Sequence, residues 1–488
     1  MSTATQVRPG KLFINGEWQD AASGQTFEVH NPALGEVLTT CAEAGPQDVD
    51  RAVRAARAAF DDEAGAWRKL APRDREKLLR AVADGIQKRA EEFAQLETLN
   101  NGKPLFESKI DVSESISVFQ YFSGWPTKIT GSVLPMSTGP FHTYTLREPL
   151  GVVGSIVPWN FPLNMATWHV APALAAGNTV VLKPAQQTPM TALLLAEVMA
   201  EAGMPAGAFN VVPGPGRAAG QALVDHPGVD KISFTGSTEV GKGIARACAD
   251  SVKKVSLELG GKSPNVIFAD ADLEAAARGA VAGIFYGKGE VCAAGSRLLV
   301  ERSAHDAIVD KVVEQAKKRP PGDPFDPKTR LGAVVSAAQQ KTVLGYIEKG
   351  QSEGARLRCG GKSATVNGKG YFVEATVFDQ VRPEMTIARE EIFGPVLVVL
   401  PFDTEEEAVA LANDSPYGLA AGVWTKDVKR AHRVARRLAA GTVWVNTYNR
   451  YDAVAPFGGY KQSGFGRLLG ESALEGYTQT KTVWVDLS

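Results

Sequence analysis

Short apolar runs alternate with helical stretches between Gly151 and Leu259, and this rhythm constrains the fold more than any other feature. The apolar runs show no polar–apolar alternation, so both faces of each predicted strand should be buried. They lie at 151–157, 178–182, 209–212, 231–234 and 255–259, with helices ending near 175 and spanning about 189–202, 216–225 and 238–249. Buried strands that alternate with helices predict a doubly wound parallel sheet, as in a Rossmann-like domain.

A second α/β series follows and predicts a second domain. Its strands are expected at 265–268, 396–402 and 442–446, with helices near 272–286, 303–318 and after Thr404. The N-terminal part is mixed. It predicts a hairpin at 11–18 around Asn15-Gly16 and helices at 48–60 and 72–99, the second of which is stopped by Asn100–Pro104.

Three segments fit neither series. Residues 128–134 and 141–147 alternate in polarity and are joined by a Ser-Thr-Gly-Pro turn, and the tail at 481–487 also alternates. A two-stranded ribbon is marginally stable alone in water. We therefore expect these segments to pair across a subunit boundary, in a dimer or tetramer.

The composition excludes several classes of protein. The net charge of −1 excludes a protein whose main role is binding nucleic acid, which needs a basic excess. No charged residue lies between Pro149 and Leu182, but three prolines and three asparagines in that stretch argue against a membrane span. The four cysteines form no Cys-x-x-Cys pair, the histidines form no metal-spaced cluster, and Met1–Gly10 lacks an apolar signal core. We expect a cytoplasmic protein without a metal.

Two motifs lie where a strand ends. The segment Phe234–Gly241 opens a helix with Gly236 and Ser237, where backbone N–H groups and the helix dipole favour an anion; the alternative is a tight strand–helix turn. Glu258 lies at the end of the last strand of the first series, before Gly260-Gly261. Such a carboxylate would face a domain junction, or would be a solvated loop residue.

Two further motifs offer a nucleophile and an amide. Cys292 is followed by small residues that leave space for an approaching molecule, although a lone cysteine is more often a small buried apolar residue. Asn160 follows the first strand within Pro-Trp-Asn-Phe-Pro. Its amide could donate to a developing oxyanion, or it could cap the helix that follows.

These motifs occur in one order with Leu-Lys-Pro-Ala (182–185), Glu-Ile-Phe-Gly-Pro-Val (391–396) and Pro-Phe-Gly-Gly-Tyr-Lys-x-Ser-Gly (456–464). Together they resemble the NAD(P)-dependent aldehyde dehydrogenase superfamily, of the hydrolytic Cys/Glu type, over nearly the whole chain. The resemblance implies an α/β fold with a Rossmann-like cofactor domain, a second α/β catalytic domain and a small β oligomerisation arm. The implied cofactor domain comprises residues 1–126 and 148–260, and the implied catalytic domain comprises residues 261–465. The implied arm and tail are residues 127–147 and 466–488.

The resemblance also implies an aldehyde oxidation with NAD or NADP as cofactor. Cys292 would attack the aldehyde carbon, Asn160 and the backbone N–H of Cys292 would form the oxyanion hole, and Glu258 would activate the water that hydrolyses the thioester. The cofactor-binding residues carried over are Trp159, Lys183, Gln186, Gly216, Phe234, Thr235, Gly236, Ser237, Gly241, Leu259, Gly260, Glu391 and Phe393.

The same resemblance gives a substrate tunnel. Its lining positions match Phe161, Met165, Trp168, Tyr286, Val291, Ala293, Tyr451 and Phe457, and Asn164 and Asn449 could add polar contacts. An aromatic-walled slot without charge favours hydrophobic or aromatic aldehydes that carry no charge.

Three residues depart from the family pattern. Gln186 stands where NAD-preferring members often have Glu, so a 2′-phosphate would not be repelled. Lys288, close before Cys292, could lower the pKa of the thiol or point to solvent. Leu468 stands where many members have a Glu assigned to proton relay.

Two other functions remain open from the sequence. A CoA-acylating relative would cleave the thioester with CoA instead of water, but such relatives commonly lack the glutamate that is present here as Glu258. A structural protein on the same fold would have no physical reason to keep both Cys292 and Glu258.

Overall fold

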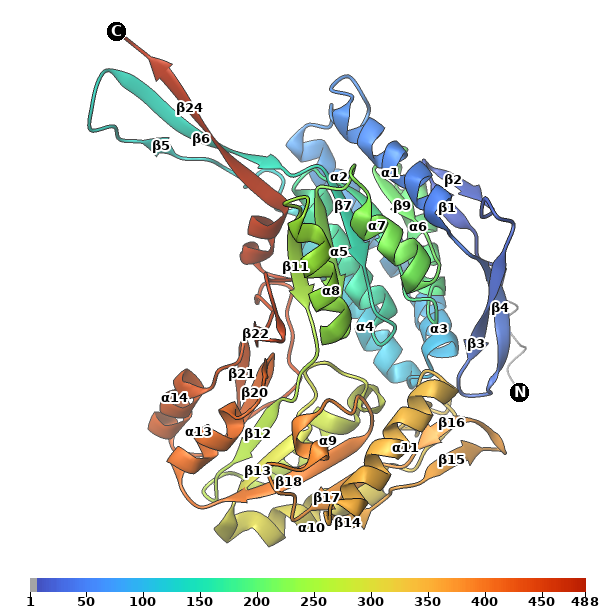
Figure 1. Ribbon diagram of the computed structural model, residues 1–488, viewed down its shortest axis with the longest axis vertical. Coiled ribbons are helices and arrows are strands. Elements are labelled where there is room, and N and C mark those ends of the chain that lie inside the picture. The colour runs from blue at the N-terminus through green and yellow to red at the C-terminus, as the bar shows by residue number, and fades with distance from the viewer. Residues whose placement is uncertain (1–6) are drawn as a thin grey trace.

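Two large sheets and a projecting arm organise residues 7–488, the part of the chain that this computed structural model describes (Figure 1). The first sheet has the strand order β2-β1-β9-β8-β7-β10-β11-β23. Its strands are β1 (Leu12–Ile14), β2 (Glu17–Gln19), β7 (Val152–Ile156), β8 (Thr179–Lys183), β9 (Phe209–Val211), β10 (Lys231–Thr235), β11 (Lys254–Glu258) and β23 (Gly464–Phe465). The strands predicted between residues 151 and 259 are confirmed, and they run parallel as expected.

Helices cover both faces of this sheet (Figure 1). They are α1 (Pro46–Asp61), α2 (Pro72–Lys88), α3 (Ala90–Asn101), α4 (Leu105–Ser123), α5 (Pro162–Ala175), α6 (Met190–Glu201), α7 (Gln221–Asp225) after the π-helical turn η1 (Gly216–Gly220), and α8 (Thr238–Ala249). The predicted single helix at 72–99 is wrong. Arg89 leaves the helical conformation (φ −106°, ψ 19°), and its guanidinium binds Glu92 and Glu197 on two different helices.

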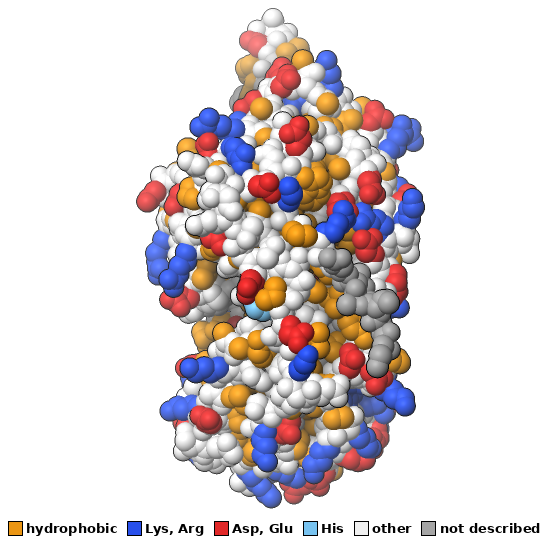
Figure 2. All heavy atoms as spheres, turned by 90° about the vertical axis from the view of Figure 1, so that its right-hand side faces the viewer, with side chains coloured by type: hydrophobic (Ala, Val, Ile, Leu, Met, Phe, Trp, Pro, Cys, Tyr) orange, Lys and Arg blue, Asp and Glu red, His pale blue; other side chains and the backbone are white. Residues whose placement is uncertain are grey.

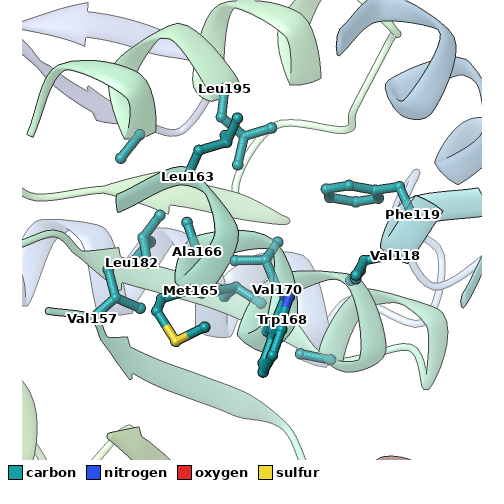
Figure 3. Packing of buried hydrophobic residues seen from close by; sticks show 14 of the residues in the cluster. Val118, Phe119, Val157, Leu163, Met165, Ala166, Trp168, Val170, Leu182 and Leu195 are labelled. Carbon is teal, nitrogen blue, oxygen red and sulfur yellow. The ribbon is translucent and has the colours of Figure 1, made fainter. Parts of the chain in front are cut away.

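The largest core lies between the first sheet and α2, α4, α5 and α6. In Figure 3, Leu163 of α5 points toward Leu195 of α6, whereas Met165 and Trp168 leave α5 on the other side. The apolar stretch after Pro149 is therefore a strand, a turn and a buried helix, as predicted. Within residues 7–488 no helix has the length and apolar character needed to cross a membrane.

The second sheet has the order β14-β17-β18-β13-β12-β20-β21 and confirms the predicted second α/β series. Its strands are β12 (Pro264–Ile267), β13 (Arg297–Glu301), β14 (Arg356–Cys359), β17 (Thr376–Asp379), β18 (Val396–Phe402), β20 (Ala420–Trp424) and β21 (Thr442–Val445). Its helices are α9 (Leu273–Phe285), α10 (His305–Lys317), α11 (Ala337–Ser352), α12 (Thr386–Arg389), α13 (Glu405–Asn413) and α14 (Val428–Arg437).

Shorter elements connect these layers. Paired strands are β3 (Thr26–Asn31) with β4 (Glu36–Ala42), β15 (Ser363–Val366) with β16 (Lys369–Val373), and β19 (Tyr417–Gly418) with β22 (Tyr460–Lys461). The 3₁₀ turns are η2 (Tyr286–Gly289), η3 (Arg302–Ala304) and η4 (Glu471–Tyr477). On the face shown in Figure 2, acidic and basic side chains are interspersed, in keeping with the net charge of −1.

The arm is a three-stranded sheet that projects from the body (Figure 1). It consists of β5 (Val133–Leu134), β6 (Phe141–Pro149) and β24 (Thr478–Asp486), in the order β24-β6-β5. The predicted hairpin is confirmed, with a shorter first strand. The tail pairs with β6 from Thr478 opposite Pro149 to Asp486 opposite Phe141, so it finds its strand partner within its own chain rather than across a subunit boundary. Self-association stays a prediction.

Candidate active site

The strand order of the first sheet reverses between β7 and β10, which are hydrogen-bonded neighbours. Trp159 and Asn160 follow β7, and Gly236 and Ser237 follow β10. Both segments therefore lie at the carboxyl edge of the sheet. Open α/β sheets bind ligands in the crevice outside this edge, at the point of reversal. The first sheet thus brings four of the predicted site residues to one place.

Cys292 lies on the loop before β13 of the second sheet and is half-buried. Gly261 packs so closely on the carbonyl of Cys292 that any side chain there would overlap with it. Burial, together with the nearby carboxylates of Glu391 and Glu258, raises the pKa of the Cys292 thiol to about 12. The thiol is therefore protonated at neutral pH, and a base must take its proton before it can act as a nucleophile.

Glu258 ends β11, and its side chain is buried, so its interpretation as a solvated loop residue is wrong. Neither oxygen of the carboxylate has a hydrogen-bond partner among the described residues. Burial raises the pKa of Glu258 well above its ordinary value, and the positive charge of Arg467 offsets only part of this shift. Because Glu258 also acts on the pKa of Cys292, the two residues face the same site.

Asn160 is buried, and its Nδ2 donates to the backbone oxygen of Glu290 at 2.9 Å. The helix-cap interpretation is wrong, because the N-cap of α5 is Phe161 and no side chain caps that helix. An amide nitrogen carries a second N–H. The structure therefore leaves one Asn160 donor for a ligand on the loop side of the site, where Glu290 precedes Cys292 by two positions.

From its place in the sequence, Lys288 was expected either to lower the pKa of the Cys292 thiol or to point to solvent, and the structure shows neither. It is 1% exposed, so it does not point to solvent. Its Nζ forms an ion pair with Glu290 at 2.9 Å and donates to Asn101 Oδ1 at 2.5 Å. The ammonium is thus held by its own partners, and the pKa of Cys292 is raised rather than lowered.

Leu468 is buried and exchanges two backbone hydrogen bonds with Phe457. No carboxylate replaces the missing glutamate at this position. The charge from this segment that acts on the pKa of Glu258 is the guanidinium of Arg467, which donates to the backbone oxygens of Gly459 and Gly466.

The residues predicted for the phosphate and adenosine half of a cofactor line the crevice edge. Ser237 is the N-cap of α8, at the place where the sequence predicted that a helix opens, and it is exposed. Gly241 of that helix packs against Leu259. Lys183, at the end of β8, is buried and donates to the backbone oxygen of Gly214 at 3.2 Å; burial lowers its pKa to about 8. Other predicted residues at the same edge are Gln186, Gly216, Phe234, Thr235 and Gly236.

A second group joins the two sheets. Glu391 Oε1 accepts the N–H of Gly261 at 3.0 Å, and Gly260 leaves no room for a side chain beside that carboxylate. Burial raises the pKa of Glu391 to about 7. The rings of Trp159 and Phe393 meet edge to face with centroids 5.2 Å apart. Residues of both sheets therefore meet at this edge.

The predicted tunnel residues form two aromatic groups. Trp168, Tyr451 and Phe457 contact one another with centroids 5.5 to 6.1 Å apart. Phe161 and Tyr286 stack separately, with centroids at 6.4 Å. The structure brings Met165 and Ala293 into the same apolar cluster as Trp168 and Phe457, with Cys292 packed against it. Val291 instead packs into the core of the second sheet.

Polar neighbours change the expected roles of two asparagines. Asn164 Nδ2 donates to Glu114 Oε2 at 2.8 Å, and its Oδ1 accepts from Trp168 Nε1 at 3.1 Å. Asn449 donates to the backbone oxygen of Ala282, and its Oδ1 accepts from the Tyr451 hydroxyl. Both side chains are therefore already bonded within the protein.

Glu114 and Asn101 are site residues that the sequence interpretation missed. Glu114 lies on α4, a helix that had not been predicted. Burial and the nearby Asp111 raise its pKa to about 7, and it contributes to the raised pKa of Tyr451. Asn101 ends α3 and donates to the backbone oxygen of Trp159 at 2.8 Å. Three acidic residues at helical spacing, Glu107, Asp111 and Glu114, were the available signal for Glu114.

Comparisons with known proteins identify the family of this chain. The model of the Aldehyde dehydrogenase family matches residues 18–483. The chain is 52% identical over 478 residues to the putative aldehyde dehydrogenase DhaS of Bacillus subtilis (strain 168), covering 98% of this chain and 96% of that protein.

Two solved structures share the fold, with the same TM-score. The NAD+ complex of an aldehyde dehydrogenase from Bacillus cereus has a TM-score of 0.96 at 51% identity, covering 98% of this chain and 97% of the other. A mutant of the P. syringae indole-3-acetaldehyde dehydrogenase AldA, in complex with NAD+ and IAA, has a TM-score of 0.96 at 47% identity, with the same shares covered. The chain therefore belongs to the aldehyde dehydrogenase family of oxidoreductases, as its ordered motifs predicted.

Proposed function

We propose that this protein oxidises an aldehyde to the carboxylic acid and reduces NAD(P)+. The observation that carries the proposal is that Glu258, a buried carboxylate without a hydrogen-bond partner among the described residues, lies close enough to Cys292 to raise the pKa of its thiol. A nucleophile and a base in one water-poor crevice are what a covalent route to the acid requires.

Cys292 is the proposed nucleophile. Once deprotonated, its sulfur attacks the aldehyde carbon and forms a thiohemiacetal. The oxygen that gains negative charge is held by the free N–H of the Asn160 amide and by the backbone N–H of Cys292. Loss of one such donor typically costs about 10²–10³ in rate. Oxidation of the same carbon then leaves a thioester on Cys292.

Glu258 is the proposed base for the second half of the reaction. Its carboxylate takes a proton from water, the hydroxyl oxygen adds to the thioester carbon, and the carbon–sulfur bond breaks to release the acid and the thiolate. The raised pKa favours proton uptake, and the absence of a hydrogen-bond partner among the described residues leaves both oxygens available to water.

The crevice residues fit NAD(P)+, which supplies the electron acceptor when bound. The open N-terminus of α8 at Gly236-Ser237 and the Lys183 ammonium form a donor set suited to phosphate and ribose oxygens. We assign Trp159 and Ser237 to the adenosine and diphosphate half, Lys183 to the adenosine ribose, Glu391 to the nicotinamide ribose, and Phe393 to the side of the ring.

Either cofactor fits the adenosine end. Gln186 carries no charge that would repel a 2′-phosphate, so we propose that both NAD and NADP are accepted. The Bacillus cereus relative, solved with NAD+, supports the use of NAD.

The proposed substrate is an uncharged hydrophobic or aromatic aldehyde. The aromatic group of Trp168, Tyr451 and Phe457 borders the cluster against which Cys292 packs, and such walls suit an apolar body. The P. syringae relative acts on indole-3-acetaldehyde, which is an aldehyde of this kind.

The proposed domains are 1–126 with 148–260 for the cofactor and 261–465 for catalysis. The arm and tail, 127–147 and 466–488, are assigned to a dimer or tetramer. Exposed apolar residues on the arm support this assignment, including Val133 at 69% and Trp484 at 56% exposure. We place the protein in the cytoplasm, because its four cysteines are all unpaired, as is usual in a reducing compartment.

The test measures NAD(P)H formation by absorbance with a panel of aldehydes, with NAD and NADP, and with and without CoA. Wild-type protein should form NAD(P)H and free acid without CoA, and Cys292→Ala should form none while still binding cofactor. Cys359→Ala, which removes another half-buried thiol, is the control and should keep its activity. Turnover by Cys292→Ala, or product only with CoA, would overturn the proposal.

A further inference from the structure

Hydrogen bonds and an ion pair form a closed ring around Asn160. Asn160 Nδ2 donates to the backbone oxygen of Glu290 at 2.9 Å, and the Glu290 carboxylate pairs with Lys288 Nζ at 2.9 Å. Lys288 Nζ donates to Asn101 Oδ1 at 2.5 Å. Asn101 Nδ2 in turn donates to the backbone oxygens of Trp159 at 2.8 Å and Asn160 at 3.5 Å, which closes the ring. We call these five residues the Asn160 ring.

Four of the five residues in the ring are buried, and Trp159 is half-buried. The exposed fractions are 1% for Lys288 and Glu290, 0% for Asn101 and 6% for Asn160. Removing one member of a buried ion pair leaves an uncompensated charge, which is strongly unfavourable. Lys288 and Glu290 therefore hold each other at a fixed place, because neither can turn toward water.

The backbone also directs Lys288 inward. Gly287, Lys288 and Gly289 all have positive φ, at 57°, 61° and 71°. This conformation costs free energy for a residue with a side chain and persists only where the surroundings impose it. The N–H of Gly287 donates to the buried carboxylate of Glu107 at 3.2 Å, which anchors the turn to α4.

The Asn160 ring connects the segment after β7 with the loop that carries Cys292, and the proposed reaction needs these two segments in a fixed relative position. Asn160 and Trp159 follow β7 of the first sheet, whereas Lys288 and Glu290 lie on the loop that carries Cys292 before β13 of the second. Glu290 is two residues from Cys292, and its backbone oxygen receives the Asn160 amide directly. The direction of the remaining Asn160 N–H is thus set by the loop that holds the sulfur.

We propose that Lys288 and Glu290 are positioning residues that aim the Asn160 amide at the oxygen of the substrate bound to Cys292. The inference rests on the proposed function, in which Asn160 is an oxyanion donor. Lys288 acts through Asn101, which holds the carbonyls of the 159–160 turn, and Glu290 acts through its backbone oxygen and its pair with Lys288. Neither residue touches the substrate.

The test uses the double variant Lys288→Met/Glu290→Gln, which removes one positive and one negative charge together, so the net charge of the buried ring does not change. The amide oxygen introduced by Glu290→Gln can still accept the N–H of Val335 that Glu290 Oε1 accepts now, at 3.0 Å. We expect the rate of the NADH burst to fall by about 10- to 100-fold, because a misplacement of about 1 Å can cost about 10²-fold. The dissociation constant for NAD and the rate of Cys292 alkylation by iodoacetamide should not change, since neither needs the oxyanion donor.

The matched control is Lys231→Met. Lys231 is another lysine that is 1% exposed, but it lies at the start of β10, at the opposite edge of the sheet, where it donates to Ser256. This variant removes a buried lysine side chain without contact to the Asn160 ring, and it should keep the burst rate. Urea unfolding of both variants confirms that folded protein is compared.

A cycle with Asn160→Ala separates positioning from a general effect on the fold. If Lys288 and Glu290 act through Asn160, the double variant should cause no further loss of burst rate once Asn160 is alanine. An unchanged burst in the double variant, or a loss that adds fully to that of Asn160→Ala, would overturn the proposal. A full burst in Asn160→Ala alone would contradict the oxyanion assignment in the proposed function, and with it this inference.

Discussion

Glu258 is paired with Gly464 across the antiparallel strands β11 and β23, so a segment from near the C-terminus holds the backbone of the buried carboxylate. Gly464 has a φ of +122°, and a side chain there would overlap with the carbonyl of Leu257. The N–H of Leu259 also donates to the Ser463 carbonyl at 2.9 Å. The position of Glu258 therefore depends on the close approach of a glycine-containing strand.

Substitution Gly464→Ala should lower both stability and turnover. The positive φ alone costs about 1–3 kcal/mol for alanine, and the overlap with Leu257 must push β23 away from Glu258. Urea unfolding and steady-state kcat measure the two effects. Gly354→Ala is the control, because Gly354 also has a positive φ (+90°) but has open space for a Cβ. Equal losses in the two variants would show that contact with β11 is unimportant.

Substitution Glu258→Gln should slow hydrolysis of the thioester more than its formation. Glutamine keeps the shape of the side chain but cannot accept a proton from water. We expect a rapid burst of NADH, of one equivalent per active site, followed by turnover slowed by about 10²–10⁴-fold. Stopped-flow absorbance measures both phases. A native steady-state rate would mean that another group activates the water.

The same substitution should stabilise the fold at neutral pH. Because the native pKa of Glu258 is raised, its favourable contribution is present below the ordinary value of 4.5 and is lost as the pH rises toward the native pKa. Each unit of difference corresponds to about 1.4 kcal/mol. Urea midpoints should agree between wild type and Glu258→Gln near pH 4 and diverge in favour of the variant by pH 8. A pH-independent difference would contradict the burial of an ionisable carboxyl.

Substitution Gln186→Glu should lower kcat/KM for NADP far more than for NAD. A carboxylate accepts hydrogen bonds from ribose hydroxyls but repels a 2′-phosphate, and poorly solvated like charges can cost several kcal/mol. Gln187→Glu, at the exposed neighbouring position, controls for the added charge and should affect the cofactors much less. Equal losses with both cofactors in Gln186→Glu would exclude it as the selector.

Deletion of Lys481–Ser488 should weaken self-association. The deletion removes most of β24, which pairs with β6 through its last residues, and it takes away the exposed Trp484 that packs on Phe141. Sedimentation velocity should show a smaller species than wild type. Val252→Ala, which trims an exposed apolar side chain outside the arm, should leave the oligomer intact. A monomeric wild type would refute the role of the arm.

The sequence by itself determined the parallel strands of the first sheet, three strands of the second (β12, β18 and β21), the helix start at Ser237 and the place of Glu258 at a strand end, because these follow from local periodicity and capping. Its ordered motifs also identified the family. It could not determine features that depend on contacts distant in the chain. At the helix break, Arg89 forms ion pairs with residues of α3 and α6. The pairing of β24 with β6 likewise depends on where the fold places β6.

Only the tertiary structure decided the partners of Asn160 and Lys288. From the local pattern alone, an asparagine before a helix is expected to cap that helix. A lysine in a glycine-containing turn is expected to be exposed to solvent. Both tendencies are overridden here because Glu290 and Asn101, from different parts of the chain, meet these side chains inside the protein. Once water is excluded, a polar group takes whatever partner the fold brings to it, and no spacing along the sequence encodes that partner.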